Sequence, residues 1–379
     1  MSKWKKTLQE LSVRRKMIKA FKAGHFYLGD IERPIFPKIH AVSVGENTTI
    51  TFTIPNGLDP KTITKNDYIF KQIFGKKIEL EGEVKKFVLS IYSKGIPKNL
   101  TYQAKTITPL LAPHRLGIIC GKDKNGEWIT YDLATKPHIL IAGETGSGKS
   151  TQLRSILTSL ILTKKPSELE IYLGDCKKSE FHIFRKVEHV KCVYSSARDI
   201  GKMLSNIKKE LDERSNLTEL FEVSHVDDLP PEHRRPYILV CIDEFVMLRK
   251  DETIMDILTE IVAIGRTLGV FAILSMQRPN AKVLDTTIRA NLTTSMGFQL
   301  RDAMESKIVN TPDAHKIDIA GRFIMNSDKL YEIQAPYLEM EDAKKLLNPF
   351  IVMKSPVKDI TEAPKKLTEE DVFNDIKRT

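Results

Sequence analysis

The sequence predicts an α/β protein in which a mainly parallel, doubly wound sheet is preceded by a small α/β or β-rich accessory domain. From residue 138 onward, short apolar runs of strand length alternate with longer helical stretches. That alternation is typical of parallel strands covered by helices. Before residue 110, alternating segments at 49–54 and 87–92 are separated by Gly, Asn and Pro clusters, which indicates short strands joined by turns.

The expected elements of the larger domain follow in chain order. Residues 117–120 and 128–132 are expected to form a hairpin, because Asn125-Gly126 between them favours a tight turn. Residues 109–113, which begin and end with proline, are expected to be the linker between the domains. Strands are expected at 138–142, 171–174, 237–242, 270–275 and 295–299, and helices at 149–163, 197–214 and 253–268.

The composition is that of a globular protein with one basic segment. The 379 residues are 41% hydrophobic and 28% charged, which excludes a wholly disordered chain, a collagen and a coiled-coil rod. The net charge is +10, yet residues 23–353 hold 45 basic and 42 acidic residues, whereas residues 1–22 hold eight basic residues and one acid. The basicity is therefore concentrated in an N-terminal arm.

The arm is expected to form one amphipathic basic helix, because Trp4, Leu8, Leu11, Ile18 and Phe21 recur at helical spacing. Three interpretations stay open: the helix lies on an anionic membrane, it touches nucleic acid, or it is a solvated leader.

The cysteines and apolar segments indicate a cytoplasmic protein. Cys120, Cys176, Cys192 and Cys241 have the spacing of neither a disulfide scaffold nor a zinc site. No apolar run approaches the length that a membrane helix needs. Peripheral attachment at the inner face of the membrane, through the arm, stays open.

A phosphate-binding loop is the most specific motif. The spacing G-x-x-x-x-G-K-[ST] comes directly after the expected strand 138–142 and leads into the expected helix 149–163. Backbone N–H groups and the helix N-terminus would bind the anion, Lys149 would reach the β- and γ-phosphates, and Ser150 would bind Mg²⁺. The expected nucleotide-binding residues are Gly143, Glu144, Thr145, Gly146, Ser147, Gly148, Lys149, Ser150, Thr151 and, from a later strand, Asp243.

Three polar residues follow two other apolar strands. Asp243 and Glu244 end the run 237–242, and the carboxyl ends of parallel strands are where such folds bind ligands. We expect Asp243 to hold Mg²⁺ and Glu244 to polarise the attacking water; the alternative is that they cap a helix. Gln277 follows the run 270–275 and would sense the γ-phosphate, or else is a polar residue at a helix entry. ATP and Mg²⁺ are the expected cofactors.

These residues resemble the FtsK/SpoIIIE DNA translocases, within the wider group of ring-forming pumps that also contains conjugative coupling ATPases. The likeness covers roughly residues 115–335. Its blocks are 121–126, 132–134, 137–143, 175–180, Glu210 with Arg214, 265–270, 277–279, 288–292 and 298–299.

The resemblance implies a RecA-like P-loop NTPase domain that forms a ring, expected to be a hexamer. Such a ring hydrolyses ATP between subunits and pulls double-stranded DNA through its centre. An arginine from the neighbouring subunit stabilises charge on the γ-phosphate in rings of this kind. Arg266 is the first candidate for that role and Arg322 the second, with an ordinary salt bridge as the alternative for each.

The resemblance also sets limits. The chromosomal translocases carry N-terminal membrane spans and a C-terminal winged-helix module. No span is expected here, and the 40 residues after Glu339 are too few for that module. An arm (1–24), an accessory domain (25–110), a motor (111–340) and a charged tail (341–379) look more like the FtsK-like ATPases of conjugative plasmids and integrative elements.

The expected function is ATP-dependent DNA translocation, in transfer or maintenance of a mobile element or in DNA segregation. A membrane or transfer-machinery partner is expected to bind residues 1–22. The alternatives are a pump of the same group that moves protein and a non-hydrolysing DNA-binding scaffold.

Overall fold

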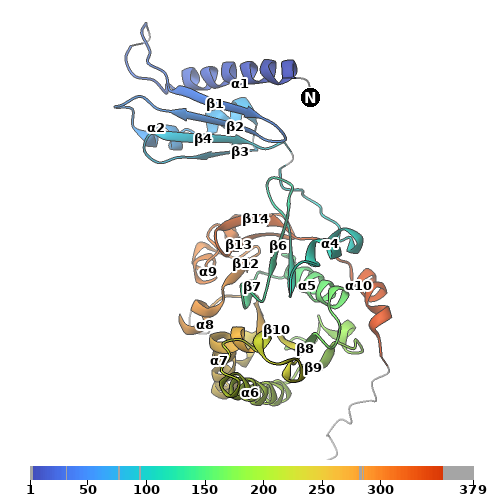
Figure 1. Cartoon of the computed structure of the whole chain (residues 1–379). Coiled ribbons are helices and arrows are strands. Elements are labelled where there is room, and N and C mark those ends of the chain that lie inside the picture. The colour runs from blue at the N-terminus through green and yellow to red at the C-terminus, as the bar shows by residue number, and fades with distance from the viewer. Residues whose placement is uncertain are drawn as a thin grey trace, which may run out of the picture.

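The computed structural model shows two domains, a small one at the N-terminal end of the chain and a larger one below it in Figure 1. The structure describes residues 3–30, 32–75, 77–93, 95–280, 284 and 286–352. The small domain holds a four-stranded sheet and the large domain a ten-stranded sheet. The tail expected at 341–379 is wrong in its first part, because α10 (Met340–Leu347) packs on α5 (Lys149–Thr163) with Ala343 and Leu347 buried; residues 353–379 lie outside the described residues.

The small domain is an antiparallel sheet with helices packed on it. Aromatic residues dominate its core: the rings of Phe21, Phe52 and Phe70 are buried with centroids 5.3 to 6.4 Å apart. Its strands, in sheet order, are β1 (Lys38–Val44), β2 (Thr48–Thr53), β4 (Lys86–Ile91) and β3 (Ile78–Glu81), and its helices are α1 (Lys3–Ala23), α2 (Pro60–Lys65) and α3 (Tyr68–Phe74). The strands expected at 49–54 and 87–92 are thus confirmed as β2 and β4.

The basic arm is part of this core. Met17, Ala20 and Phe21 of α1 are fully buried among the aromatic residues of the small domain. A helix with one face in a core is not a solvated leader, so that alternative is wrong. No helix in the described ranges combines the length and the apolar character that crossing a bilayer requires.

The ten-stranded sheet confirms the mainly parallel α/β prediction. Its six strands from β12 to β9 run parallel, and the strands on the other side of β12 are paired antiparallel. In sheet order the strands are β6 (Trp128–Asp132), β5 (Gly117–Lys122), β14 (Leu330–Gln334), β13 (Arg322–Asn326), β12 (Thr294–Gly297), β7 (Ile139–Ala142), β11 (Val270–Met276), β10 (Tyr237–Asp243), β8 (Leu169–Asp175) and β9 (Val190–Tyr194).

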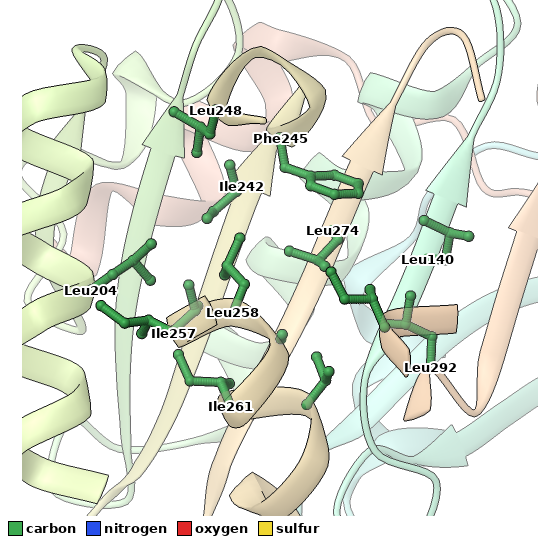
Figure 2. Close-up of a cluster of buried hydrophobic side chains, with 14 of the residues drawn as sticks. Leu140, Leu204, Ile242, Phe245, Leu248, Ile257, Leu258, Ile261, Leu274 and Leu292 are labelled. Atoms are coloured by element: carbon green, nitrogen blue, oxygen red, sulfur yellow. The ribbon is translucent and has the colours of Figure 1, made fainter. Parts of the chain in front are cut away.

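Helices cover both faces of this sheet because successive residues of a buried strand point to opposite sides. Leu140, Ile242 and Leu274 pack into one cluster with α6 and α7 (Figure 2). Ile139 and Ile141 pack into a second cluster with α5. The helices of the large domain are α4 (Ala104–Leu111), α5 (Lys149–Thr163), α6 (Ala197–Leu220), α7 (Glu252–Leu268), α8 (Thr286–Asn291), α9 (Ala303–Ile308) and α10 (Met340–Leu347).

The linker expected at 109–113 is wrong. Pro109 lies inside α4, which packs on α5 beside α10. Burial of Ile107 and Leu111 outweighs the poor helix propensity of proline near a helix end. Tyr102, just before α4, donates its backbone N–H to the Tyr337 carbonyl over 2.9 Å. We therefore propose that the domain boundary lies earlier, between β4 and Pro97.

The β5–β6 hairpin reaches the small domain. Its connection is longer than the tight turn that Asn125-Gly126 suggested: the Asp123 carboxylate accepts the N–H groups of Asn125 and Glu127 over 2.8 and 3.0 Å, and Gly126 takes the positive φ. Lys124 at the tip pairs with Glu79 of β3. The hairpin thus contacts both sheets.

Arg214 of α6 ties three segments of the large domain together. Its guanidinium is 2% exposed and donates to Glu210 over 2.8 Å, to the Leu268 carbonyl over 3.0 Å and to the Pro236 carbonyl over 2.7 Å. These carbonyls lie at the end of α7 and before β10. Arg214 therefore fixes the segments that enter two central strands.

We predict that Arg214→Met lowers the free energy of unfolding by about 3 kcal/mol, because two buried carbonyls lose their donor. Urea unfolding followed by circular dichroism measures the change. Arg198→Met, at an exposed position of the same helix, is the control. A loss within about 0.5 kcal/mol of the control would contradict the structural role.

Candidate phosphate-binding site

Three neighbouring strands bring the candidate residues to one edge of the large sheet. β11 lies between β7 and β10, and all three run parallel. The glycine-rich loop follows β7, Ser275 lies near the end of β11, and Asp243 ends β10. Because the carboxyl ends of parallel strands share an edge, residues from three distant stretches of sequence meet there.

The loop backbone depends on glycine at two positions. Gly146 and Gly148 have φ angles of 83° and 105°, which L-residues with a side chain rarely adopt. A Cβ at residue 148 would also lie 2.7 Å from the backbone of Gly321, whose N–H donates to the Ser147 carbonyl over 2.8 Å. The buried Ser147 hydroxyl has no partner within the described part of the chain. This hydroxyl of the loop is therefore available to donate a hydrogen bond to a ligand.

Lys149, Ser275 and Asp243 form a buried polar cluster. The Lys149 Nζ atom lies 2.7 Å from Asp243 Oδ1 and 2.8 Å from Ser275 Oγ, and the Ser275 hydroxyl donates to the same carboxylate oxygen over 2.7 Å. The Lys149 and Asp243 side chains are each 3% exposed. Charges so deeply buried are tolerated only when they are paired and hydrogen-bonded, so the cluster holds the ammonium at the loop.

Glu244 lies next to this cluster in a strained backbone conformation. Its φ angle is 56°, in the left-handed region that costs a residue with a side chain about 1 kcal/mol or more. Its Oε1 atom accepts the N–H of Gln277 over 3.2 Å, and its Oε2 atom lies 2.8 Å from Lys177 Nζ. Oε1 is therefore hydrogen-bonded, whereas Oε2 lies within ion-pair distance of Lys177 but has no hydrogen-bond partner among the described residues.

A cavity of about 330 Å³ opens beside the loop. Gly146, Gly148 and Thr151 line it together with Gly321 and Tyr337. This size is within the range of small-molecule sites. The cavity borders the glycine-rich loop, whereas Lys149 and Asp243 are not among its lining residues. The loop and the ammonium behind it fit the phosphates of a nucleotide, and the cavity lies beside them.

The oxygen ligands present also fit Mg²⁺. Asp243 offers a carboxylate, and Ser150, in the first turn of α5, offers a hydroxyl. Mg²⁺ prefers such hard oxygen donors and usually completes its shell with water and phosphate oxygens. Ser150 and Asp243 are thus the residues that would hold the ion.

Cys176, which follows β8 beside the site, is no nucleophile. Burial, with smaller effects from Asp243 and Asp175, raises the pKa of the Cys176 thiol to about 12. A thiol with that pKa stays protonated at neutral pH and is unreactive. All four cysteines are free thiols.

The structure brings together most of the residues expected from sequence and separates two. The loop residues, Asp243, Glu244 and Gln277 share one edge of the sheet. Arg266 is exposed in the last turn of α7, which leads into the opposite end of β11. Arg322 is buried, and its guanidinium donates to Gln334 over 3.0 Å, to Glu332 over 2.9 Å and to the Pro97 carbonyl over 3.0 Å.

Two residues of the site did not stand out in the sequence. Ser275 is a single hydroxyl residue near the end of an otherwise apolar strand, which is weak evidence for a functional residue. Its role is clear only in the structure, where it contacts Asp243. Lys177 lies in the block 175–180, whose turn is fixed by Asp175: its carboxylate accepts the N–H groups of Ser179, Glu180 and Phe181, each over 3.1 Å. Only the fold brings that turn beside Glu244.

Solved structures share the fold. The pCW3 conjugation coupling protein TcpA, in a monomer form with ATPγS, matches with a TM-score of 0.63 and 23% identity, covering 88% of this chain and 98% of that one. EssC, ATPases 2 and 3, from Geobacillus thermodenitrificans matches with a TM-score of 0.59 and 21% identity, covering 67% of this chain and 51% of that one. At these identities the matches establish the architecture alone.

Sequence relatives agree on one family. The DNA translocase FtsK of Tropheryma whipplei is 29% identical over 230 residues, and that of Borreliella burgdorferi is 30% identical over 210 residues. These stretches cover 56% and 52% of this chain but 31% and 26% of the relatives, so the chain spans about a third or less of their length. Residues 110–233 match the family model of FtsK/SpoIIIE. This stretch therefore matches the FtsK/SpoIIIE family, in a chain that shares the fold of these solved structures.

Proposed function

We propose that the large domain hydrolyses ATP. The observation that carries the proposal is the cluster of Lys149, Ser275 and Asp243 at the glycine-rich loop, with Glu244 beside it. A buried ammonium held by a carboxylate is prepared to exchange that partner for phosphate oxygens, and the bound Mg²⁺ would neutralise the charge that develops during phosphoryl transfer.

Each residue then has a distinct task. The loop N–H groups and Lys149 bind the phosphates, Ser150 and Asp243 hold the ion, and Ser275 orients both Lys149 and Asp243. Glu244 accepts hydrogen bonds from the attacking water and so raises its nucleophilicity. Gln277, whose N–H is already bonded to Glu244, would report the state of the γ-phosphate to β11.

We further propose that hydrolysis drives translocation of double-stranded DNA through a ring, expected to be a hexamer. The support is the family match over residues 110–233 and the DNA translocases among the relatives. Arg266 is the better candidate for an arginine acting in the neighbouring subunit, because it is exposed whereas Arg322 is held within its own chain. A setting in the transfer or maintenance of a mobile element remains part of this proposal.

We predict that long duplex DNA raises ATP turnover at least about tenfold, because in a translocase DNA binding and ATP hydrolysis are coupled. Turnover is measured with no DNA, with single-stranded DNA and with duplex DNA. Stimulation by single-stranded DNA alone would change the proposed substrate. Turnover that no DNA alters would reject the translocase and favour a pump that moves protein.

We predict that Lys149→Ala abolishes nucleotide binding, whereas Glu244→Gln preserves binding and lowers turnover about 10²- to 10⁴-fold, the usual contribution of a general base. A fluorescent ATP analogue measures binding and phosphate release measures turnover. Glu252→Gln replaces an exposed carboxylate shortly after Glu244 in the chain and is the control. Undiminished turnover by Glu244→Gln would remove that residue from the mechanism.

We predict that Lys177→Met raises turnover without DNA by about two- to fivefold. The Lys177 side chain is 33% exposed, and such a screened ion pair contributes about 0.5 to 1 kcal/mol. Without Lys177, the Glu244 carboxylate no longer has to give up this ion pair before it binds the attacking water. The same ATP turnover assay measures it, with kcat and KM determined separately. Lys178→Met at the adjacent exposed position is the control, and a turnover that falls instead would mean that Lys177 positions Glu244 for catalysis.

A further inference from the structure

Helix α1 carries a second apolar stripe that the small domain does not cover. We call it the outward stripe: its members are 78%, 54%, 49% and 43% exposed, and they are Trp4, Leu8, Leu11 and Ile18. They follow one another at steps of four, three and seven residues, which places them on one face of a helix. Met17 and Phe21, which are buried, lie about 135° and about 95° around the helix from the centre of this stripe, at 3.6 residues per turn. The helix is thus apolar on two sides, and only one of them is in a core.

Basic side chains surround the outward stripe. Lys5, Lys16 and Lys19 are exposed along one side of it, and Arg15 and Lys22 are exposed between its members. Glu10, the single acid of the helix, lies toward the buried face. The outward surface of α1 therefore combines large apolar side chains with uncompensated positive charge, while residues 23–353 together are nearly neutral.

We propose that α1 lies along the surface of a bilayer that contains anionic lipid. A helix with a Trp and Leu stripe rimmed by lysines is the pattern of interfacial helices, whose apolar side chains enter the headgroup boundary while lysines reach lipid phosphates. Figure 1 shows α1 along the top of the small domain, at the end of the molecule away from the ten-stranded sheet. The large domain therefore does not cover α1.

A bilayer fits this surface better than DNA does. DNA phosphates are bound by basic and amide side chains, and that contact would leave Trp4, Leu8 and Leu11 exposed to water. A bilayer buries the stripe and neutralises the lysines in one event. The proposal does not depend on ATP hydrolysis, so a failure of one leaves the other standing.

Trp4 is a natural probe of the contact. The chain has two tryptophans, so Trp128→Phe leaves Trp4 as the only one. In this variant of the full chain, we expect vesicles of equal parts phosphatidylglycerol and phosphatidylcholine to shift Trp4 emission to shorter wavelength, and brominated lipid in those vesicles to quench it. Vesicles of phosphatidylcholine alone should do neither.

Two sets of substitutions separate the apolar and the charged contributions. Replacing Leu8 and Leu11 by Ser should weaken partition into the mixed vesicles about a hundredfold, because two large apolar side chains are lost. Lys5→Gln, Lys16→Gln and Lys19→Gln together should weaken it about ten- to a hundredfold. The control, Lys61→Gln, Lys65→Gln and Lys209→Gln together, removes the same charge from exposed positions outside α1 and should leave partition unchanged.

Because the substituted positions are exposed, the variants should keep the far-ultraviolet circular dichroism of the parent. Wild-type co-sedimentation with the mixed vesicles that is lost at high salt would support the proposal without any variant. Three results would overturn it: no co-sedimentation of the wild type with the mixed vesicles, co-sedimentation with an unshifted Trp4 spectrum, or equal partition of the Leu8/Leu11 variant. Loss of duplex-DNA binding in the three-lysine variant, with no vesicle binding by the wild type, would assign α1 to DNA instead.

Discussion

The buried ion pair between Lys149 and Asp243 is the interaction on which the arrangement of the large domain depends. Two charges at 3% exposure are costly unless each finds partners, and here the Ser275 hydroxyl contacts both. The three residues come from helix α5 and strands β11 and β10, so the pairing requires a strand order in which β11 separates β7 from β10. The strand order of the sheet therefore determines whether these three side chains can meet.

The apolar clusters on the two faces of the sheet offset the cost of burying these two charges. Leu140 and Ile242 pack toward α6 and α7, while Ile139 and Ile141 pack toward α5. With both faces covered, the strand ends cannot shift independently, so the polar groups at the sheet edge are held at hydrogen-bonding distance. The strain of Glu244, in a left-handed conformation beside this cluster, is tolerated because its neighbours on both sides are fixed.

The sequence predicted those parts of the structure that depend on local patterns, such as the spacing of apolar residues and of the glycine-rich motif. The period of apolar residues predicted α5 at its observed bounds and α7 to within one residue, and the spacing around Lys149 predicted the loop with its setting between strand and helix. It failed where tertiary contacts outweigh local preference. Pro109 suggested a linker, yet burial of Ile107 and Leu111 makes that segment a helix. Likewise Lys177 has no local pattern, because its partner Glu244 is 67 positions away and only the pairing of β8 with β10 brings them together.

Arg322 shows how the two domains are tied to the phosphate-binding loop. The resemblance suggested that this arginine acts on a neighbouring subunit, but its guanidinium is bound by Gln334, Glu332 and the Pro97 carbonyl. Gly321, the residue before it, donates to the Ser147 carbonyl of the loop and lies against Gly148. Pro97 belongs to the segment that leads from the small domain into α4. Residues 321–322 therefore contact the loop on one side and the inter-domain segment on the other. A Cβ at position 321 would lie 2.7 Å from the Gln334 amide nitrogen, and a Cβ at position 148 would lie 2.7 Å from the Gly321 backbone. The loop, Gly321 and the Gln334 side chain that accepts from Arg322 are therefore packed against one another.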